Sequence, residues 1–275
     1  MTATHAALPS DLASALAARP ELGGTVVRYF PELASTNDTA AALAAAGAGD
    51  GTVVLAGRQT AGRGRRGREW DSPPGAGLYM SVLLRGRQSP VVTLLAGVAV
   101  AEAVQETASV AAELKWPNDV VAAPTAAAAA LPLSPRRKIA GILTEALPAE
   151  SAGDVAVVVG IGVNVRTRAF PAALVGRAVA IESLAGRRVD GAVLCADLLV
   201  RLRRWRRRMA GEGEGLVVAR WRALSPSSRG AAVAWEAAGI ARRGVTAGVD
   251  DDGALLVSCD GGTERIVGGV VRWEP

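Results

Sequence analysis

KIAGILTEA (residues 138–146) and DVAVVVGIGVNV (residues 154–165) are two apolar stretches that alternate or run on with β-branched residues. Short runs of this kind are typical of strands in the core of a sheet. Gly160 and Gly162 lie toward the end of the second stretch and are followed by Asn164. Glycines inside a strand permit close approach of a ligand. The two stretches therefore predict core strands, one of which suits a planar ligand.

Further strands and helices are predicted around this pair. The apolar, β-branched runs predict strands at Val26–Phe30, Gly51–Arg58, Leu78–Arg85, Glu113–Trp116 and Val120–Ala122. Helical patterns predict an Ala-rich helix from Thr39 to about Ala46, a helix of roughly 18 residues opened by Pro90, and a helix at Asp190–Met209. Strands and helices do not alternate as a regular βαβ repeat. We therefore expect an α+β fold with a mixed β-sheet and helices.

Three segments are predicted from changes in composition. Residues 1–24 are Ala/Pro-rich, and we expect a flexible N-terminal segment that is too short for a helix-turn-helix domain. We expect residues 25–224 to form the main domain. Residues 225–275 contain short strands with Gly turns, which predict a small all-β unit, a compact barrel or sandwich. The low-complexity stretch Pro124–Arg137 is expected to be an exposed insert.

Composition excludes several classes of protein. The chain has 275 residues, of which 50% are hydrophobic and 21% charged, with a net charge of +5, so most of it must be globular rather than disordered. Two cysteines and one histidine, His5, exclude a disulfide scaffold, a zinc cluster and a His-dependent catalytic triad. Without a signal peptide or a long apolar segment, a soluble protein of the reducing cytoplasm is expected.

The basic residues are almost all arginine. Only Lys115 and Lys138 are lysines among 31 basic residues. Lysine is a compact point charge, whereas arginine is a planar fork. A lysine in such an arginine-rich chain therefore indicates a position that needs a compact point charge. The alternative is that these two positions carry lysine by chance.

The segment Gly62–Gly67 (GRGRRG) matches the pattern G-x-G-x-x-G but is not a dinucleotide fingerprint. The following residues, Arg68–Pro74 (REWDSPP), cannot begin a long helix, and no acidic residue stands about 20 positions on. The four arginines among residues 63–68 repel one another, and binding of an anion that neutralises them is therefore favourable. They are Arg63, Arg65, Arg66 and Arg68. An anion-ordered loop is one interpretation; a solvated basic loop or a nucleic-acid contact is the other.

A second polar cluster is Lys115–Asp119 (KWPND), which places a lysine, an aromatic plane, an amide and a carboxylate in one turn. Asn118 and Asp119 can reach a metal–phosphate or a ribose, or simply form an Asx turn. Lys138 begins a core strand, where its ammonium can bridge two oxyanions.

Five motifs, in this order along the chain, resemble the biotin protein ligases, biotin–[acetyl-CoA-carboxylase] ligases, over roughly residues 25–170. They are Ser35-Thr36-Asn37, Gln59–Arg68 with Trp70, Lys115–Asp119, Lys138–Leu143 and Gly160–Asn164. The resemblance implies a class II synthetase-like catalytic domain at 25–224 and an SH3-like β-barrel at 225–275. It also implies a monofunctional type without the DNA-binding domain, since only about 25 residues precede the first predicted strand.

The resemblance further implies a reaction in two steps. Biotin and ATP, with Mg²⁺, give biotinyl-5′-AMP, and the adenylate then acylates a lysine of a biotin carboxyl carrier domain of an acyl-CoA carboxylase. No protein-bound metal, no specific DNA binding and no membrane association are expected, and the chain would be a monomer or weak homodimer.

Site residues are carried over by matching position. Lys138 and Arg65 would be catalytic. The biotin-binding set would be Ser35, Thr36, Asn37, Gln59, Arg63, Gly64, Arg65 and Lys138. The ATP- and adenylate-binding set would be Arg63, Arg66, Arg68, Trp70, Lys115, Asn118, Asp119, Lys138 and Asn164.

Two other functions remain open at this stage. One is a lipoate- or octanoate-type acyl ligase or transferase of the same fold. The other is an Arg-rich nucleic-acid-binding module built on the Gly–Arg loop and on Arg201–Arg208 (RLRRWRRR). Another interpretation of Arg201–Arg208 is the solvent-exposed face of a helix, where the aliphatic parts of the arginine side chains cover apolar surface.

Overall fold

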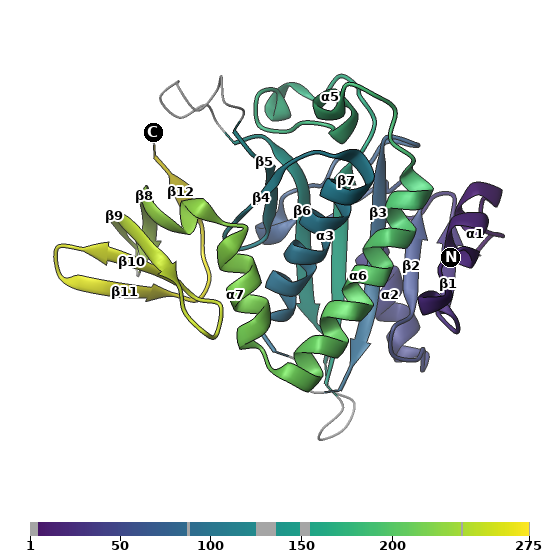
Figure 1. Ribbon diagram of the computed structural model, residues 1–275, viewed down its shortest axis with the longest axis horizontal. Coiled ribbons are helices and arrows are strands. Elements are labelled where there is room, and N and C mark those ends of the chain that lie inside the picture. Colours follow the sequence, from purple (N-terminus) through teal and green to yellow (C-terminus); the bar gives the residue numbers. More distant parts are fainter. Residues whose placement is uncertain (1–4, 87–88, 125–135, 149–154, 238, 275) are drawn as a thin grey trace.

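The computed structural model describes residues 5–86, 89–124, 136–148, 155–237 and 239–274 (Figure 1). The helices are α1 (Ser10–Ala17), α2 (Thr36–Ala45), α3 (Val92–Ala108), α5 (Ile181–Ala185), α6 (Gly191–Glu212) and α7 (Gly215–Ala223). Short 3₁₀ turns are η1 (Pro20–Leu22), η2 (Arg65–Gly67), η3 (Ala172–Leu174) and η4 (Pro226–Ser228). None of the helices in these ranges has the length and apolar character that crossing a membrane requires.

Seven strands form the main sheet in the order β1-β2-β3-β7-β6-β5-β4. They are β1 (Val27–Phe30), β2 (Val53–Ala56), β3 (Gly77–Arg85), β4 (Ala112–Lys115), β5 (Asp119–Ala122), β6 (Lys138–Ala146) and β7 (Ala156–Asn164). β1 and β2 are parallel, and the other neighbours are antiparallel. The predicted mixed sheet is confirmed, and the two stretches that decided it, β6 and β7, lie side by side within it.

The two faces of this sheet carry different cores. Met80, Val82 and Leu84 of β3 belong to the core that includes α3 and α6, whereas Tyr79 and Leu83 pack with α2. Successive side chains of a strand point to opposite faces, so one apolar strand serves both layers. Figure 1 shows α3 and α6 on one side of the sheet and α2 behind it.

The C-terminal strands form a separate antiparallel sheet in the order β11-β10-β9-β8-β12. They are β8 (Arg229–Ala237), β9 (Ile240–Val249), β10 (Leu255–Cys259), β11 (Gly262–Ile266) and β12 (Val271–Trp273). The Trp116 Nε1–H group donates to the Gly253 carbonyl at 2.9 Å, which fastens this sheet to the Lys115–Asp119 turn. A small all-β unit is thus present, while the proposed division at residue 224 stays a prediction.

The structure differs from the sequence expectations at several places, and α5 is among the elements that were not predicted. Residues 10–22 form α1 and η1, and Leu12 and Leu22 are buried in the main core, so this part is folded rather than flexible. α2 begins at Thr36, three residues before the expected start, because Ser35 is its N-cap. α7 was not foreseen. Most of the predicted Pro124–Arg137 insert lies outside the described residues.

Trp221 of α7 gives a direct test of the core. Its side chain is 2% exposed, and the position of a Cβ on Gly97 of α3 would lie 3.9 Å from its indole nitrogen. Trp221→Ala would leave a cavity, so we expect a loss of about 3–5 kcal/mol in the free energy of unfolding, measured by urea denaturation. Val267→Ala is the control, because Val267 is 73% exposed and should change stability by less than about 0.5 kcal/mol. Equal losses in both variants would contradict the assigned core.

Candidate functional site

A small cavity lies on the α2 face of the main sheet, between the start of α2, the middle of β6 and β7, and the loop that follows β2. Its volume is about 50 Å³. The residues that line it are Ser35, Thr36, Asn37, Gln59, Arg63, Gly64, Arg65, Trp70, Asn118, Lys138, Gly141, Ile142, Leu143, Gly160, Ile161 and Gly162. All eight residues of the predicted biotin-binding set are among them.

Glycines on adjacent strands form the floor of the cavity. Gly141 of β6 is opposite Gly162 of β7, and Leu143 is opposite Gly160. A Cβ on Gly162 would lie 2.3 Å from the indole ring of Trp70, and a Cβ on Gly160 would lie 2.1 Å from Asn37 Oδ1. No side chain fits at either position without displacing a neighbour. The flat floor expected from the two glycines is present, and Trp70 is the planar group that covers part of it.

The start of α2 presents hydroxyl and amide groups to the cavity. Ser35 is the N-cap, and its Oγ accepts a long hydrogen bond from Asp38 N at 3.5 Å. The backbone N–H and the hydroxyl of Thr36 both donate to Gln59 Oε1, at 2.8 and 3.1 Å. Gln59 Nε2 then donates to Ser72 Oγ at 2.8 Å. These bonds hold the side chain of Gln59 in one orientation at the cavity wall.

Ser81 and Glu145 do not line the cavity but hydrogen-bond to this polar wall, and neither was predicted from the sequence. Ser81 Oγ is fully buried and lies 2.8 Å from Thr36 Oγ1 and 2.6 Å from Asn37 Oδ1, so it donates its one proton to these acceptors. Asn37 Nδ2 donates to Glu145 Oε2 at 2.6 Å. The available signal was a polar residue within an apolar stretch: Ser81 in LYMSVLLR, and Glu145, which follows Thr144, in KIAGILTEA.

Positive side chains line the other wall of the cavity. Lys138 Nζ lies 2.6 Å from Asp119 Oδ1 and 5.2 Å from the centre of the Trp70 ring. Arg65 Nη1 donates to Asn118 Oδ1 at 3.3 Å, and Asn118 Nδ2 donates to the Ile142 carbonyl at 2.6 Å. The strand β6 and the Gly–Arg loop therefore bring Lys138 and Arg65 to one cavity.

Burial makes the Arg65 guanidinium costly in the absence of an anion. Loss of hydration lowers the pKa of Arg65, and the neighbouring charge of Arg66 lowers it further, while Asp119 opposes them. A bound anion would offset both effects. Arg63 is held differently, because its guanidinium lies 2.7 Å from carboxylate oxygens of both Asp38 and Glu145.

Five residues predicted for the nucleotide side do not line the cavity. Arg66 and Arg68 are exposed, and the Arg66 guanidinium points toward Gly269, between β11 and β12. Lys115 Nζ lies 4.7 Å from the centre of the Trp273 ring, and burial lowers the pKa of Lys115. Arg66, Arg68 and Lys115 therefore lie outside the cavity because their side chains are turned to solvent or to the C-terminal β unit.

Asp119 and Asn164 are connected to the cavity through Lys138. Asp119 pairs with the Lys138 ammonium, and Asn164 Nδ2 donates to the Lys138 carbonyl at 3.3 Å. Both thus position Lys138 in the structure, one at its charged end and one at its backbone.

Comparison with known proteins agrees with this arrangement. Residues 29–164 match the model of the Biotin/lipoate A/B protein ligase family. The "Bifunctional ligase/repressor BirA" of Bacillus subtilis is 33% identical over 254 residues, which cover 90% of this chain and 74% of the relative. The chain belongs to this family. The "Biotin--[acetyl-CoA-carboxylase] ligase" of Paracoccus denitrificans is 32% identical, with 84% of this chain and 94% of the relative covered.

The fold agrees as well. The biotin protein ligase of Aquifex aeolicus, solved in complex with biotin and ATP, superposes with a TM-score of 0.75 at 26% identity and covers 90% of this chain and 98% of that one. The resemblance inferred from the five motifs is therefore confirmed, as is the α+β fold with its second, smaller sheet.

The basic run of α6 does not favour a nucleic-acid-binding module. Arg201 pairs with Asp197 at 2.8 Å, Arg206 with Asp50 at 2.6 Å and Arg208 with Glu212 at 2.8 Å. Trp205, between them, is 4% exposed. Much of the run's charge is thus neutralised by carboxylates of the same chain, which leaves fewer guanidinium groups for phosphates.

Gly162→Ala tests the floor of the cavity. The added methyl group would occupy space held by the Trp70 ring, so we expect Trp70 to move away and stability to fall by about 1–3 kcal/mol. A crystal structure of the variant checks the first effect and urea denaturation the second. Gly49→Ala is the control, because nothing lies within 4 Å of its Cβ position. An unmoved Trp70 would contradict the close contact described here.

Proposed function

We propose that this chain is a biotin protein ligase, which joins biotin to ATP as biotinyl-5′-AMP and then transfers biotin to a lysine of a carrier protein. The proposal rests on one observation: Lys138 and Arg65 line the same cavity as the amide and hydroxyl groups of Asn37, Gln59, Ser35 and Thr36. The chain also belongs to the biotin/lipoate ligase family. Names of relatives that join biotin to acetyl-CoA carboxylase support this substrate over lipoate or octanoate.

In the first step, a carboxylate oxygen of biotin attacks the α-phosphorus of ATP. A P–O bond forms, the bond to the β-phosphate bridging oxygen breaks, and pyrophosphate leaves. Two anions must approach each other, so fixed positive charges between them lower the barrier. We assign this task to Lys138 as a point charge and Arg65 as a fork. No side chain needs to remove a proton, because the carboxylate is already ionised.

Both cations have partners that an incoming anion can replace. Lys138 is held by the carboxylate of Asp119 and Arg65 by the amide oxygen of Asn118. These contacts keep the positive groups aimed at the cavity before substrate arrives. Asn118 and Asp119 also carry oxygen atoms of the kind that Mg²⁺ prefers as ligands. They would therefore be the residues to coordinate a Mg²⁺ ion bound to the phosphates of ATP.

The polar wall suits the ureido group of biotin, which has two N–H donors and one carbonyl acceptor. We assign its recognition to Ser35, Thr36, Asn37 and Gln59. Ser72 already orients Gln59, and Ser81 orients Thr36 and Asn37. Trp70 would have to leave the glycine floor for the fused rings to lie on it. Arg63 and Gly64 would close this end of the cavity, where Arg63 is tied to Asp38 and Glu145.

The remaining nucleotide-side assignments are proposals of the same kind. Trp70, Asn118 and Asn164 would serve the adenylate, and Arg66, Arg68 and Lys115 would contribute if the Gly–Arg loop and the C-terminal sheet close over it. The flexible backbone supplied by Gly62, Gly64 and Gly67 permits such a rearrangement. Closure would also shield the adenylate from water.

In the second step, the amine of a carrier lysine attacks the carbonyl carbon of the adenylate, an amide forms, AMP leaves and the amine loses a proton. We propose a biotin carboxyl carrier domain of an acyl-CoA carboxylase as the acceptor. The need for ATP and the two free thiols, Cys195 and Cys259, support the cytoplasm as the compartment. A monomeric or weakly dimeric state without specific DNA binding stays a prediction.

Removing either cation should slow adenylate formation. For Lys138→Ala and for Arg65→Ala we expect a loss on the order of 2–4 kcal/mol of transition-state stabilisation, roughly 30- to 1,000-fold in rate, by analogy with loss of one oxyanion-hole donor. Biotin-dependent exchange of labelled pyrophosphate into ATP measures the step. The control is Arg58→Ala, since Arg58 pairs with Glu32 on the surface and does not line the cavity. Native rates in both cavity variants would remove Lys138 and Arg65 from the mechanism.

Calorimetry separates biotin from its closest rival substrate. We expect biotin to bind the native chain and lipoate to bind much more weakly, because the dithiolane ring of lipoate has no polar groups to pair with Gln59 and Asn37, and unpaired buried polar groups are costly. The Asn37→Ala variant should lose most of the preference. Tighter binding of lipoate by the native chain would overturn the proposed substrate.

A further inference from the structure

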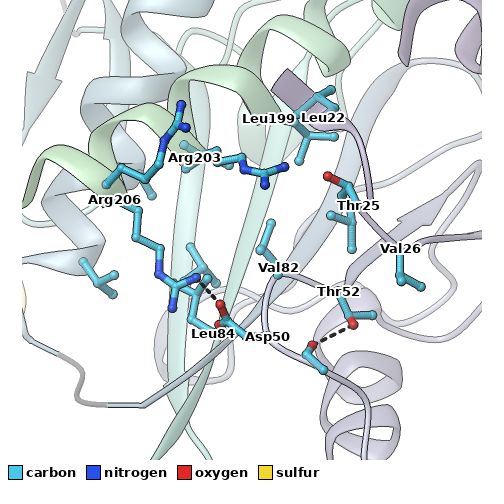
Figure 2. A pocket seen from close by; sticks show the side chains of 18 of the residues that line it. Leu22, Thr25, Val26, Asp50, Thr52, Val82, Leu84, Leu199, Arg203 and Arg206 are labelled. Carbon is cyan, nitrogen blue, oxygen red and sulfur yellow. Dashed lines mark hydrogen bonds and ion pairs between the residues drawn. The ribbon is translucent and has the colours of Figure 1, made fainter. Parts of the chain in front are cut away.

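A second and larger cavity lies on the other face of the main sheet, where nothing in the proposed reaction takes place. Its volume is about 520 Å³, within the range of small-molecule sites. The sheet forms one wall through Val53, Val82 and Leu84, and the helices α3 and α6 form another, with Leu95 and Leu199. Figure 2 shows this cavity with Val82 and Leu84 at its base.

The deep walls of this cavity are apolar. Its buried lining side chains are aliphatic except for Thr52, and the Thr52 hydroxyl already donates to the Gly49 carbonyl at 2.7 Å. A sugar or a nucleobase placed here would lose hydrogen bonds to water without replacing them. A hydrocarbon chain has no such cost and would gain from burial. The interior therefore selects for an aliphatic group.

The mouth is positively charged. Arg203, Arg206 and Arg207 of α6 line it together with Asp50, which gives a net charge of +2 at the rim. Arg206 pairs with Asp50 at 2.6 Å, and Arg203 donates to the Glu21 carbonyl at 2.7 Å. Arg207 has no hydrogen-bond or ion-pair partner within the described ranges. Figure 2 shows Arg203 and Arg206 on one side of the opening, with Thr25 and the 49% exposed Val26 on the other.

The spacing of residues in α6 explains why the basic run has this form. Leu199, Leu202, Arg203, Arg206 and Arg207 recur at intervals of three and one, which places them on one helical face. Leucines come first and arginines follow, so that face changes from apolar to cationic along the helix. A single side of α6 thus supplies both part of the wall and most of the charge at the rim.

We propose that this cavity binds a single-chain aliphatic carboxylate. The chain would lie between Val82 and Leu199, and the carboxylate would contact Arg207 and Arg203 at the rim, where guanidinium forks match carboxylate oxygens. The site is distinct from the catalytic cavity: on β3, Ser81 faces α2 and its neighbour Val82 faces α3 and α6. The inference does not depend on the proposed ligase activity.

Titration calorimetry with dodecanoate, below its micelle concentration and both with and without biotin present, tests the proposal. We expect one molecule to bind per chain, and dodecyltrimethylammonium, with the same chain length and the opposite charge, to bind at least roughly tenfold more weakly. Absence of dodecanoate binding, equal binding of the cation, or competition between dodecanoate and free biotin would each overturn it.

Two variants locate the bound molecule. Arg207→Glu should weaken dodecanoate binding by roughly tenfold, and Leu202→Trp should abolish it by filling the cavity. Arg204→Glu is the matched control, because Arg204 is exposed on the same helix but does not line the cavity, and it should change the affinity by less than about twofold. Circular dichroism confirms that each variant is folded. If Arg207→Glu and Arg204→Glu have the same effect, the carboxylate does not bind at this rim.

Discussion

The pairing of β6 with β7 brings side-chain-free backbone to the centre of the α2 face, and the cavity proposed as the catalytic site depends on it. Gly141 and Gly162 are partners across the two strands, and Gly160 lies two residues from Gly162. Because these positions carry no Cβ, Asn37 and Trp70 can rest directly on the sheet. A larger residue at any of them would displace a group that the cavity needs. The absence of side chains at these glycines thus determines how Asn37 and Trp70 pack, and through that packing it determines which groups line the cavity.

Charge balance around the cavity follows from the same closeness. Lys138 is matched with Asp119, and Arg63 with Asp38 and Glu145, so these charges are not left unpaired while the site waits for substrate. Arg65 is the exception, since an amide oxygen is its hydrogen-bond partner and burial lowers its pKa. An incoming anion therefore gains most at Arg65, because it displaces no carboxylate there.

Sequence patterns predicted the parts of the fold that rest on local rules. The glycine-bearing apolar strands and the lysine at the start of β6 were found from residue type and spacing. Ser81 and Glu145 were not, because their roles arise from pairing across the sheet to α2 and to the Gly–Arg loop, which are distant in sequence. The same reason applies to Arg66 and Lys115. Their motifs place them near the site in sequence, but tertiary contacts with the C-terminal sheet turn them away from the floor.

The alternation of β3 explains how one sheet supports two cavities of opposite character. The Ser81 hydroxyl donates a hydrogen bond to the polar wall, while Val82, the next residue, lines the apolar cavity with its methyl groups. A shift of one residue in the pairing of β3 with β7 would exchange these two faces, burying a hydroxyl among aliphatic side chains and exposing an apolar group to Asn37. The register fixed by nine successive partners, from Gly77 opposite Asn164 to Arg85 opposite Ala156, prevents that exchange. Both binding surfaces therefore depend on a single strand alignment, and a change that loosened it would damage the two together.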